Sequence, residues 1–367
     1  MEYTICHVSV GHNADDVRIF HKECLSLSRV NNYKVILCAP GNIPLGSDVI
    51  HYKISRPASS RLIRLIKSQI IFIGVIIKVR ADVWHIHDPE LLPIAVMLSY
   101  FKRRVIWDSH EDYHKQFQAK ISYREYIPIY IRPIVRIIVR FFLTRIDRRA
   151  AGIIGPTASI IKNYRNPNAT LIGNEALLEE FSSCTPKFEN NTVLFIGQVD
   201  SSHCYREIVD AISNLPELKL NVATRVFHEK DIDYSSRMLK DRFQYLGFLG
   251  RENLSAAISD SSIGLVTYSF SLNHLDNQPN KFYEFCAAGL PILATPTPFN
   301  NNLIKYSKGG VLTSGYDSKS IEIALLKLIS SKTNWLYYSG SGRDWAKING
   351  NWTVSESALL KLYLRVL

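Results

Sequence analysis

The sequence contains no C-x-x-C pair, although it has six cysteines. Their scattered positions exclude a zinc ribbon and a thioredoxin-like motif. We expect most of these thiols to be small buried side chains of a protein in a reducing compartment. The cysteines are Cys6, Cys24, Cys38, Cys184, Cys204 and Cys286.

Long apolar runs and a leader-like start are also missing. The segment most like an apolar span, residues 69–77, has about half of the 18 residues that a transmembrane helix needs. Glu2 stands near the start, and no basic segment precedes the apolar residues that follow. We therefore interpret the start as a β-strand rather than a signal peptide, and expect a cytoplasmic protein.

Acidic residues are scarcer than basic ones, and the excess is uneven. The net charge of the 367-residue chain is +11, of which residues 1–185 carry +9 and residues 186–367 carry +2. A basic half predicts an acidic partner, either a phosphorylated small molecule, an anionic membrane or a nucleic acid. Because no zinc finger, RNA-recognition or helix-turn-helix signature is present, we do not expect nucleic acid.

Apolar, β-rich runs alternate with helical patterns along the whole chain, which is typical of parallel sheets covered by helices. Two series of runs predict two doubly wound domains, at 1–175 and 191–345, joined by a polar linker at 176–190. A turn-rich segment, 338–343, precedes a last helix within 346–367. The predicted strands are 3–10, 33–39, 50–54, 83–87, 104–107, 152–155 and 170–172, then 192–197, 219–223, 243–246, 264–268, 291–294 and 310–312.

Two predicted helices in the first half, 61–80 and 128–149, are apolar with a basic residue every three to four positions. Arg132, Arg136 and Arg140 fall on one helical stripe. Two interpretations stay open with similar weight. The helices are either core helices with a solvated basic stripe, or helices that lie on an anionic membrane surface.

Ligands of doubly wound folds bind beyond the carboxyl ends of the strands, so functional residues are expected at these positions. Gly11 allows a tight turn after the first strand, and Asp15 or Asp16 can cap the following helix, which carries Arg18. Asp88 fits the start of a helix, followed by Pro89 at its first position.

His85 and His87 fall on one face of the preceding strand, but no third ligand has a matching spacing. We therefore prefer helix capping as the role of this segment and expect no metal.

Two further strand ends carry groups that suggest ligand binding. Asp108, His110, Glu111 and Asp112 crowd one loop, and a cluster of titratable groups at a sheet edge favours a catalytic site over a polar turn. Gly197 ends a strand in the second half and leads to Arg206 at a helix start, where a phosphate can bind.

The strongest segment is 275–297, LDNQPNKFYEFCAAGLPILATPT. The loop between Asp276 and Glu284 opens a helix, and the backbone N–H groups available within the turn 279–282, together with Lys281, can hold a diphosphate. The two carboxylates flank that anion site and can each accept hydrogen bonds from hydroxyl groups. An anion site between two such carboxylates indicates a nucleotide-sugar ligand.

Taken together, these motifs resemble the GT-B glycosyltransferases, most closely the retaining enzymes of family 4. The resemblance spans nearly the whole chain and rests on DVRIFHKE, HIHDPELLPIA, WDSHEDY, Gly173–Asn174, FIGQV and, most specifically, NKFYEFCAAGLPIL. It implies two Rossmann-like domains that face a cleft, with the C-terminal helix crossing back to the first domain.

The resemblance also assigns roles to residues. Asp276, where the family usually has Glu, would face the donor sugar, and Glu284 the ribose hydroxyls. His110 would meet the sugar as a catalytic residue. Donor binding would fall to Gln278, Asn280, Lys281, Arg206 and Gly197, and the acceptor side of the cleft to Gly11, Asp16, Arg18 and Glu111.

The implied reaction moves a sugar from a nucleotide-diphosphate sugar to a glycan hydroxyl with retention, without a metal or other cofactor. The family commonly uses lipid-linked acceptors in bacterial O-antigen, capsule or exopolysaccharide synthesis, which suggests a peripheral location at the inner face of the plasma membrane. An epimerase or hydrolase of the same fold, and a non-enzymatic basic module, stay open as alternatives.

Overall fold

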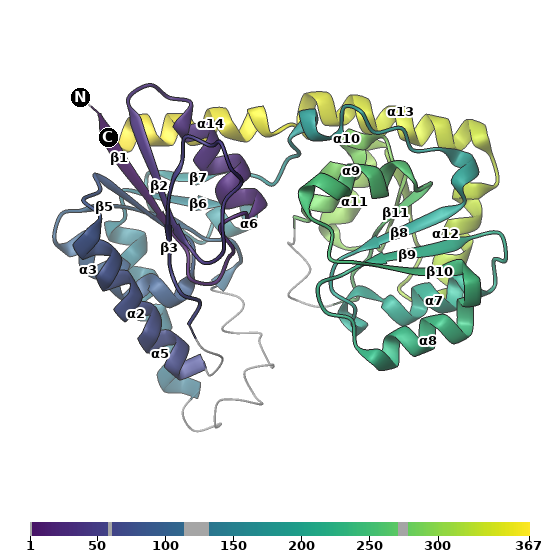
Figure 1. Cartoon of the computed structure of the whole chain (residues 1–367), viewed down its shortest axis with the longest axis horizontal. Helices are drawn as coiled ribbons and strands as arrows, with labels where there is room; N and C mark the ends of the chain where they lie inside the picture. The colour runs from purple at the N-terminus through teal and green to yellow at the C-terminus, as the bar shows by residue number, and fades with distance from the viewer. Residues whose placement is uncertain (1, 58–60, 114–131, 271–277) are drawn as a thin grey trace. The chain divides into compact units, whose positions relative to one another are not determined.

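The computed structural model describes residues 2–57, 61–113, 132–270 and 278–367. The chain forms two compact units, one of Met1–Gly173 with Thr353–Leu367 and one of Asn174–Trp352. Each unit contains a parallel sheet with helices on both faces (Figure 1). Residues 176–190, expected as a linker, are part of the second unit.

The sheet of the first unit has the strand order β3-β2-β1-β4-β5-β6-β7, in which every neighbouring pair is parallel. The chain thus starts in the middle of the sheet and builds outward in both directions, as a doubly wound fold requires. The strands are β1 (Tyr3–Val8), β2 (Tyr33–Ala39), β3 (Ile50–Lys53), β4 (Val83–Ile86), β5 (Arg104–Asp108), β6 (Gly152–Gly155) and β7 (Ala169–Leu171).

Helices α2 (Arg61–Lys78), α3 (Leu92–Tyr100) and α5 (Arg132–Arg149) cover one side of this sheet, where α3 contacts both of the others. The core between them contains Phe72, Trp84 and Trp107. The other segments are the π-helical η1 (Val17–Cys24), α1 (Leu25–Ser28), the short η2 (Pro89–Leu91), α6 (Ala158–Ile161) and α14 (Trp352–Val366).

The second unit repeats the plan with the order β10-β9-β8-β11-β12-β13. Its strands are β8 (Thr192–Ile196), β9 (Lys219–Ala223), β10 (Phe243–Gly247), β11 (Ile263–Val266), β12 (Ile292–Ala294) and β13 (Gly310–Leu312). All strands expected from the sequence are present, with ends within two residues of the predicted ones.

Two apolar cores lie on the two faces of this second sheet. One is covered by α7 (Tyr205–Ser213) and α12 (Ser318–Ile329). Helix α8 (Glu229–Leu239) contacts α7. The other is covered by α9 (Arg251–Ser259), α10 (Asn280–Ala288), α11 (Pro298–Ser307) and α13 (Lys332–Asn349). The short helices η4 (Leu178–Phe181), η5 (Phe188–Asn190), η6 (Ser201–His203) and η7 (Lys240–Arg242) lie in the connections.

The prediction of a turn-rich segment at 338–343 is wrong, because these residues lie inside helix α13. The reason is packing. Cα of Gly309 lies 3.2 Å from the place of a β-carbon on Gly342, so glycine lets α13 approach its neighbours closely. Close tertiary packing thus outweighs the low helix propensity of this segment.

The six cysteines are buried and free, as expected. Within the described residues, no helix has both the length and the apolar character needed to cross a bilayer.

Candidate functional site

Gly197 and Lys281 meet beyond the end of β8. Gly197 has a φ of +142°, a conformation that favours glycine. A β-carbon built on it would lie 3.7 Å from Nζ of Lys281, in the first turn of α10. The start of α10, where backbone N–H groups favour an anion, and a lysine ammonium are thus directed to one strand end.

The Lys281 side chain is buried and contacts few polar groups. Its ammonium donates to the carbonyl of Ile196 at 3.1 Å and lies 5.4 and 5.3 Å from the ring centres of Phe195 and Tyr268. Burial lowers the pKa of Lys281 from 10.5 to about 8. A diphosphate at this position would supply the ammonium with a negative partner, which none of the described contacts of Lys281 provides.

His203, at the end of η6, is a further polar side chain beside Lys281. Its Nδ1 lies 2.8 Å from Oδ1 of Asp200, and its ring is tilted against Tyr268 at 5.3 Å. Burial lowers the pKa of His203, and the charge of Lys281 lowers it further, against the opposing effect of Asp200. Sequence reasoning did not single out His203, because a lone histidine in a loop carries no spacing signal.

Glu284 lies one turn further along α10, with a buried side chain. Its Oε1 accepts a 2.5 Å ion-pair bond from Arg251 Nη1, and Arg251 Nη2 pairs with Glu180 of η4. The Arg251 guanidinium also stacks over the ring of Phe181 at 5.6 Å. Glu284 is therefore held in place by a Glu180–Arg251–Glu284 triad that the sequence analysis did not predict.

The remaining predicted donor residues have protein partners. Gln278 donates through Nε2 to the hydroxyl of Tyr283, and its backbone carbonyl accepts from Asn174 Nδ2 at 2.9 Å. Asn280 is the first residue of α10. Arg206 pairs with Asp231 Oδ1 at 3.2 Å and lies over Tyr234, against α8. Asp276 lies outside the described residues.

In the first unit, His110 follows β5 and meets two buried side chains. Its Nε2 is 3.1 Å from Oδ2 of Asp108 and 3.3 Å from Nδ1 of His87. Burial would raise the pKa of Asp108, but Arg18 and then His110 hold it well below its usual value. His110 is therefore oriented by a fixed carboxylate, whereas the neighbouring Glu111 is exposed.

Arg18 has a structural set of contacts. Its Nε and Nη2 donate to the two oxygens of Asp108 at 3.0 and 3.1 Å, and Nη1 donates to the carbonyls of Ile172 and Gly173. The side chain is buried. Arg18 thus holds the Asp108–His110 pair and the end of β7 together.

Asp88 corrects the capping interpretation. Its side chain makes no described capping bond to η2; instead, Oδ2 accepts from Ser9 Oγ at 2.8 Å and from the backbone N–H groups of Val10 and Gly11 at 2.6 and 3.1 Å. The Asp88 carboxylate therefore binds these three donors after β1 instead of the backbone N–H groups at the start of η2. Glycine is needed at position 11, since a β-carbon there would come within 2.7 Å of Asp88 Oδ1.

Asp16 caps η1, as expected for Asp15 or Asp16, and accepts from the backbone N–H groups of Arg18 and Ile19. It also pairs with His12, whose Nδ1 lies 3.3 Å away. Burial would lower the pKa of His12, but the hydrogen bond and charge of Asp16 raise it to about 9. Residues 11–16 therefore form a charged turn beside His110, whose ring stacks on that of His12.

The expectation that His85 and His87 lack a third ligand-type neighbour is wrong. His7 of β1 is the register partner of His85, and Glu23 of η1 lies against both histidines of that pair. The sequence could have indicated this neighbour only if β1 and β4 had been predicted as adjacent parallel strands with His7 opposite His85.

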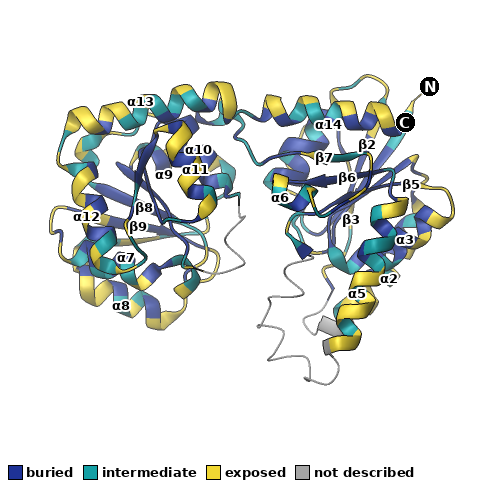
Figure 2. Cartoon of the chain, turned by 180° about the vertical axis from the view of Figure 1, so that it is seen from behind, coloured by how far each residue is buried: buried dark blue, intermediate teal, exposed yellow. Residues whose placement is uncertain are grey.

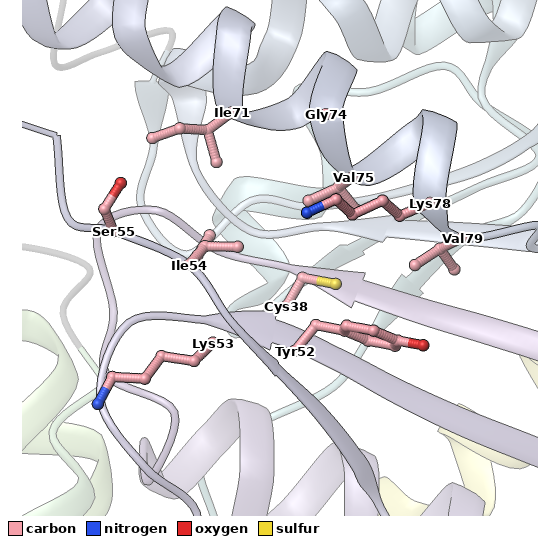
Figure 3. A pocket seen from close by; sticks show the side chains of 10 residues that line it. All are labelled: Cys38, Tyr52, Lys53, Ile54, Ser55, Ile71, Gly74, Val75, Lys78 and Val79. Atoms are coloured by element: carbon pink, nitrogen blue, oxygen red, sulfur yellow. The ribbon is translucent and has the colours of Figure 1, made fainter.

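A pocket of about 240 Å³ lies between β2, β3 and α2, as Figure 3 shows. Its walls are largely apolar, with Ile54, Ile71, Val75 and Val79, and it has the lysines Lys53 and Lys78. None of the catalytic, donor-binding or acceptor-side residues predicted from the sequence lines this pocket.

A pH dependence of anion binding follows from Lys281. In the free protein its amine is charged below pH 8 and neutral above it, so nucleoside diphosphate affinity is expected to fall above pH 8, by up to about tenfold per pH unit. Titration calorimetry from pH 7.5 to 9.5 measures this, a range in which His203 and Tyr268, the other titratable groups facing the ammonium, keep one protonation state.

Lys281→Arg is the control, because a guanidinium stays charged over this range. The same pH dependence in that variant would contradict the assignment of Lys281.

Residues 190–331 match the family model "Glycosyl transferases group 1". No curated protein sequence matches the chain. Among solved structures, the sucrose-phosphate synthase of Thermosynechococcus elongatus is similar at 14% identity and a TM-score of 0.75, covering 100% of this chain and 99% of that one. Anabaena Alr3699/HepE in complex with UDP-glucose is similar at 11% identity and a TM-score of 0.71, with 100% of both chains covered.

WaaG, a glycosyltransferase involved in lipopolysaccharide biosynthesis, is similar at 12% identity and a TM-score of 0.70, covering 98% of this chain and 99% of that one. These likenesses run over both units. The chain therefore has the GT-B fold, and the part of its second unit at 190–331 is similar to group 1 glycosyl transferases.

Proposed function

We propose that the protein is a retaining glycosyltransferase that moves a sugar from a nucleotide-diphosphate sugar to a hydroxyl group of a glycan acceptor. The observation that carries the proposal is the convergence of Gly197, Lys281 and the start of α10, with Glu284 one turn further on. The match of residues 190–331 to the group 1 family supports it, since this range includes the whole convergence.

In this proposal, Lys281 and the backbone N–H groups of α10 stabilise the nucleoside diphosphate as it leaves, where negative charge develops. Glu284, fixed by Arg251, accepts hydrogen bonds from the ribose. His110 and Asp276 are assigned to the donor sugar. The acceptor hydroxyl attacks the anomeric carbon on the face that the diphosphate vacates, its proton goes to the leaving phosphate, and no metal takes part in this step.

A glycan acceptor distinguishes this function from its alternative, an epimerase or hydrolase. We expect nucleoside diphosphate release from a panel of nucleotide-sugars to depend on an added lipid-linked oligosaccharide acceptor, with a new glycosidic product seen by mass spectrometry. Formation of free sugar or an epimer at the same rate without acceptor would instead support the alternative.

The same proposal includes a lipid-linked acceptor of a bacterial surface polysaccharide, such as O-antigen or capsule, and a location at the inner face of the plasma membrane. Exposed isoleucines on α2 support it: they follow a spacing of three and four residues, which is one helical face. They are Ile63, Ile66, Ile70, Ile73 and Ile77, between 46% and 77% exposed.

Helix α5 has the same character, with exposed Ile134, Ile137, Ile138 and Phe141 beside Arg136 and Arg140. Figure 2 shows much of its surface as exposed. Both helices also bury apolar side chains in the core, Phe72 and Leu143 among them, as the core-helix interpretation requires. A solvated basic stripe does not account for their exposed apolar side chains, and this exposure favours the alternative, two basic amphipathic helices at an anionic bilayer.

Membrane binding is expected to weaken at least tenfold in a double variant, Ile66→Glu with Ile70→Glu. Each exposed Ile can bury a side chain worth about 1.5–3 kcal/mol in the interface. Flotation with vesicles of anionic and of neutral lipid measures the effect. Leu336→Glu, at an exposed apolar position of α13, is the matched control, and equal flotation of all three proteins would contradict the assignment.

A further inference from the structure

Three histidines and one glutamate gather at the centre of the first unit, next to His110. His7 is on β1, His85 and His87 are on β4, and Glu23 is on η1. His7 and His85 are register partners on neighbouring parallel strands, and His87 follows His85 by two, so that all three rings lie on one face of the sheet.

The ligand-type atoms of these side chains are close together. His7 Nδ1 is 3.0 Å from His87 Nε2, and Glu23 Oε2 is 3.9 Å from His7 Nδ1 and 3.8 Å from His85 Nε2. One such atom from each residue lies within 4.8 Å of all the others. A tetrahedral Zn²⁺ with bonds of 2.0–2.1 Å holds its ligand atoms about 3.3 Å apart, so small shifts would suffice.

Of the atoms that face the centre, His7 Nδ1 and His87 Nε2 pair with each other, whereas those of Glu23 and His85 have no hydrogen bond within the described part of the chain. Among the described residues, neither oxygen of Glu23 nor Nε2 of His85 has a hydrogen-bond partner, although Glu23 Oε1 is 3.2 Å from Arg18 Nε. All four side chains are 0% exposed. Buried polar atoms without partners are rare and costly, and they call for an explanation.

The outward-facing ring nitrogens do have partners. His85 Nδ1 is 2.8 Å from the hydroxyl of Tyr363, and His7 Nε2 is 3.5 Å from the same hydroxyl. His87 Nδ1 is 3.3 Å from Asp108 Oδ2. Histidines that bind a metal have this arrangement, one nitrogen toward the ion and the other held by a carboxylate, hydroxyl or carbonyl group.

We propose that His7, His85, His87 and Glu23 bind one Zn²⁺ ion. Three imidazoles and one carboxylate in a buried cluster suit zinc, whereas calcium and magnesium prefer sets of oxygen ligands. With four protein ligands the site is closed, which is typical of a structural ion. The ion joins β1, β4 and η1 and, through Tyr363, fixes α14 on the first unit. It takes no part in the sugar transfer proposed above.

The test uses the full chain, stripped of metal with a chelator and then titrated with Zn²⁺. We expect one Zn²⁺ per chain by mass spectrometry, a higher melting temperature on binding, and, with Co²⁺ in its place, the strong visible absorption of a tetrahedral site. Glu23→Gln should weaken Zn²⁺ binding by at least about a hundredfold, since loss of an outer partner alone costs 10–100-fold.

A control and a second variant separate this site from its surroundings. His228→Gln changes an exposed histidine of the second unit and should bind Zn²⁺ as the wild type does. Tyr363→Phe should keep the fold, checked by circular dichroism, and weaken binding about tenfold or more; it decides the matter if Glu23→Gln does not fold.

The proposal is overturned if the stripped wild type binds no Zn²⁺ more tightly than micromolar. It is equally overturned if Glu23→Gln and Tyr363→Phe, both folded, bind Zn²⁺ as the wild type does, because the ion would then lie elsewhere. Neither result bears on the donor site, whose tests use nucleotides and the second unit.

Discussion

Glu284→Ala is expected to reduce nucleotide-sugar turnover roughly a hundredfold or more, because each charge-assisted hydrogen bond to a ribose hydroxyl contributes about 1.5–3 kcal/mol. The loss should appear in kcat/KM for the donor, and the affinity for the nucleoside diphosphate should fall with it. Steady-state kinetics and calorimetry on the same preparation measure both quantities.

The variant should stay folded. Arg251 keeps Glu180 as a partner when Glu284 is removed, so the change leaves a neutral pair rather than an isolated cation. Glu322→Ala is the matched control, because Glu322 is a carboxylate of the same unit that pairs with Lys319 on α12. Turnover by Glu284→Ala within about threefold of wild type would contradict the role of Glu284.

Arg251→Met is expected to lower the free energy of unfolding of the second unit by about 2–4 kcal/mol. The change leaves the carboxylates of Glu180 and Glu284 side by side without a cation. Removal of one partner from a buried pair costs about 3–5 kcal/mol. The figure is reduced here, because the side chains of Arg251 and Glu180 are 19% and 30% exposed. Urea unfolding followed by fluorescence measures the loss.

A double-mutant cycle tests the cause of that loss. Adding Glu180→Gln to Arg251→Met removes one of the two remaining charges and should recover part of the stability, a coupling of about 0.5–3 kcal/mol. Arg251→Lys should be intermediate, since an ammonium restores the charge but not the two-pronged geometry. Strictly additive losses in the cycle would show that the triad is not an energetic unit.

The architecture followed from local patterns. Runs such as 33–39 and 219–223 became β2 and β9 with the predicted bounds, because most of their residues are apolar and buried within a parallel sheet. The segment 338–343 failed for the opposite reason. Its glycines favour a turn locally, but in α13 Gly342 allows close packing against Gly309, a contact that a local pattern does not contain.

The site was predictable where its residues are neighbours in sequence. Lys281 and Glu284 fall in one short motif, and the structure holds them on one helix beside Gly197. Arg251 was missed, because its link to Glu284 and Glu180 exists only after α9, α10 and η4 have packed together. The histidine cluster was missed likewise, since it depends on the register of β1 against β4.

Asp88 illustrates a different limit. Its sequence context fits a helix cap, and its backbone does occupy that position. The carboxylate nevertheless turns to three donors at the end of β1, because they offer more hydrogen bonds than the helix start does. Sequence alone gives both options without the geometry that decides between them.

The most direct test of the nucleotide-sugar assignment is thermal unfolding of the chain with UDP, GDP, ADP, CMP and dTDP in turn. A ligand at 100 times its dissociation constant adds about 2.7 kcal/mol of stability. For a unit of this size that corresponds to a rise in melting temperature of about 5–10 °C. We predict such a rise with at least one nucleoside diphosphate, which would also identify the donor base; no shift with any of them at millimolar concentration would contradict the assignment.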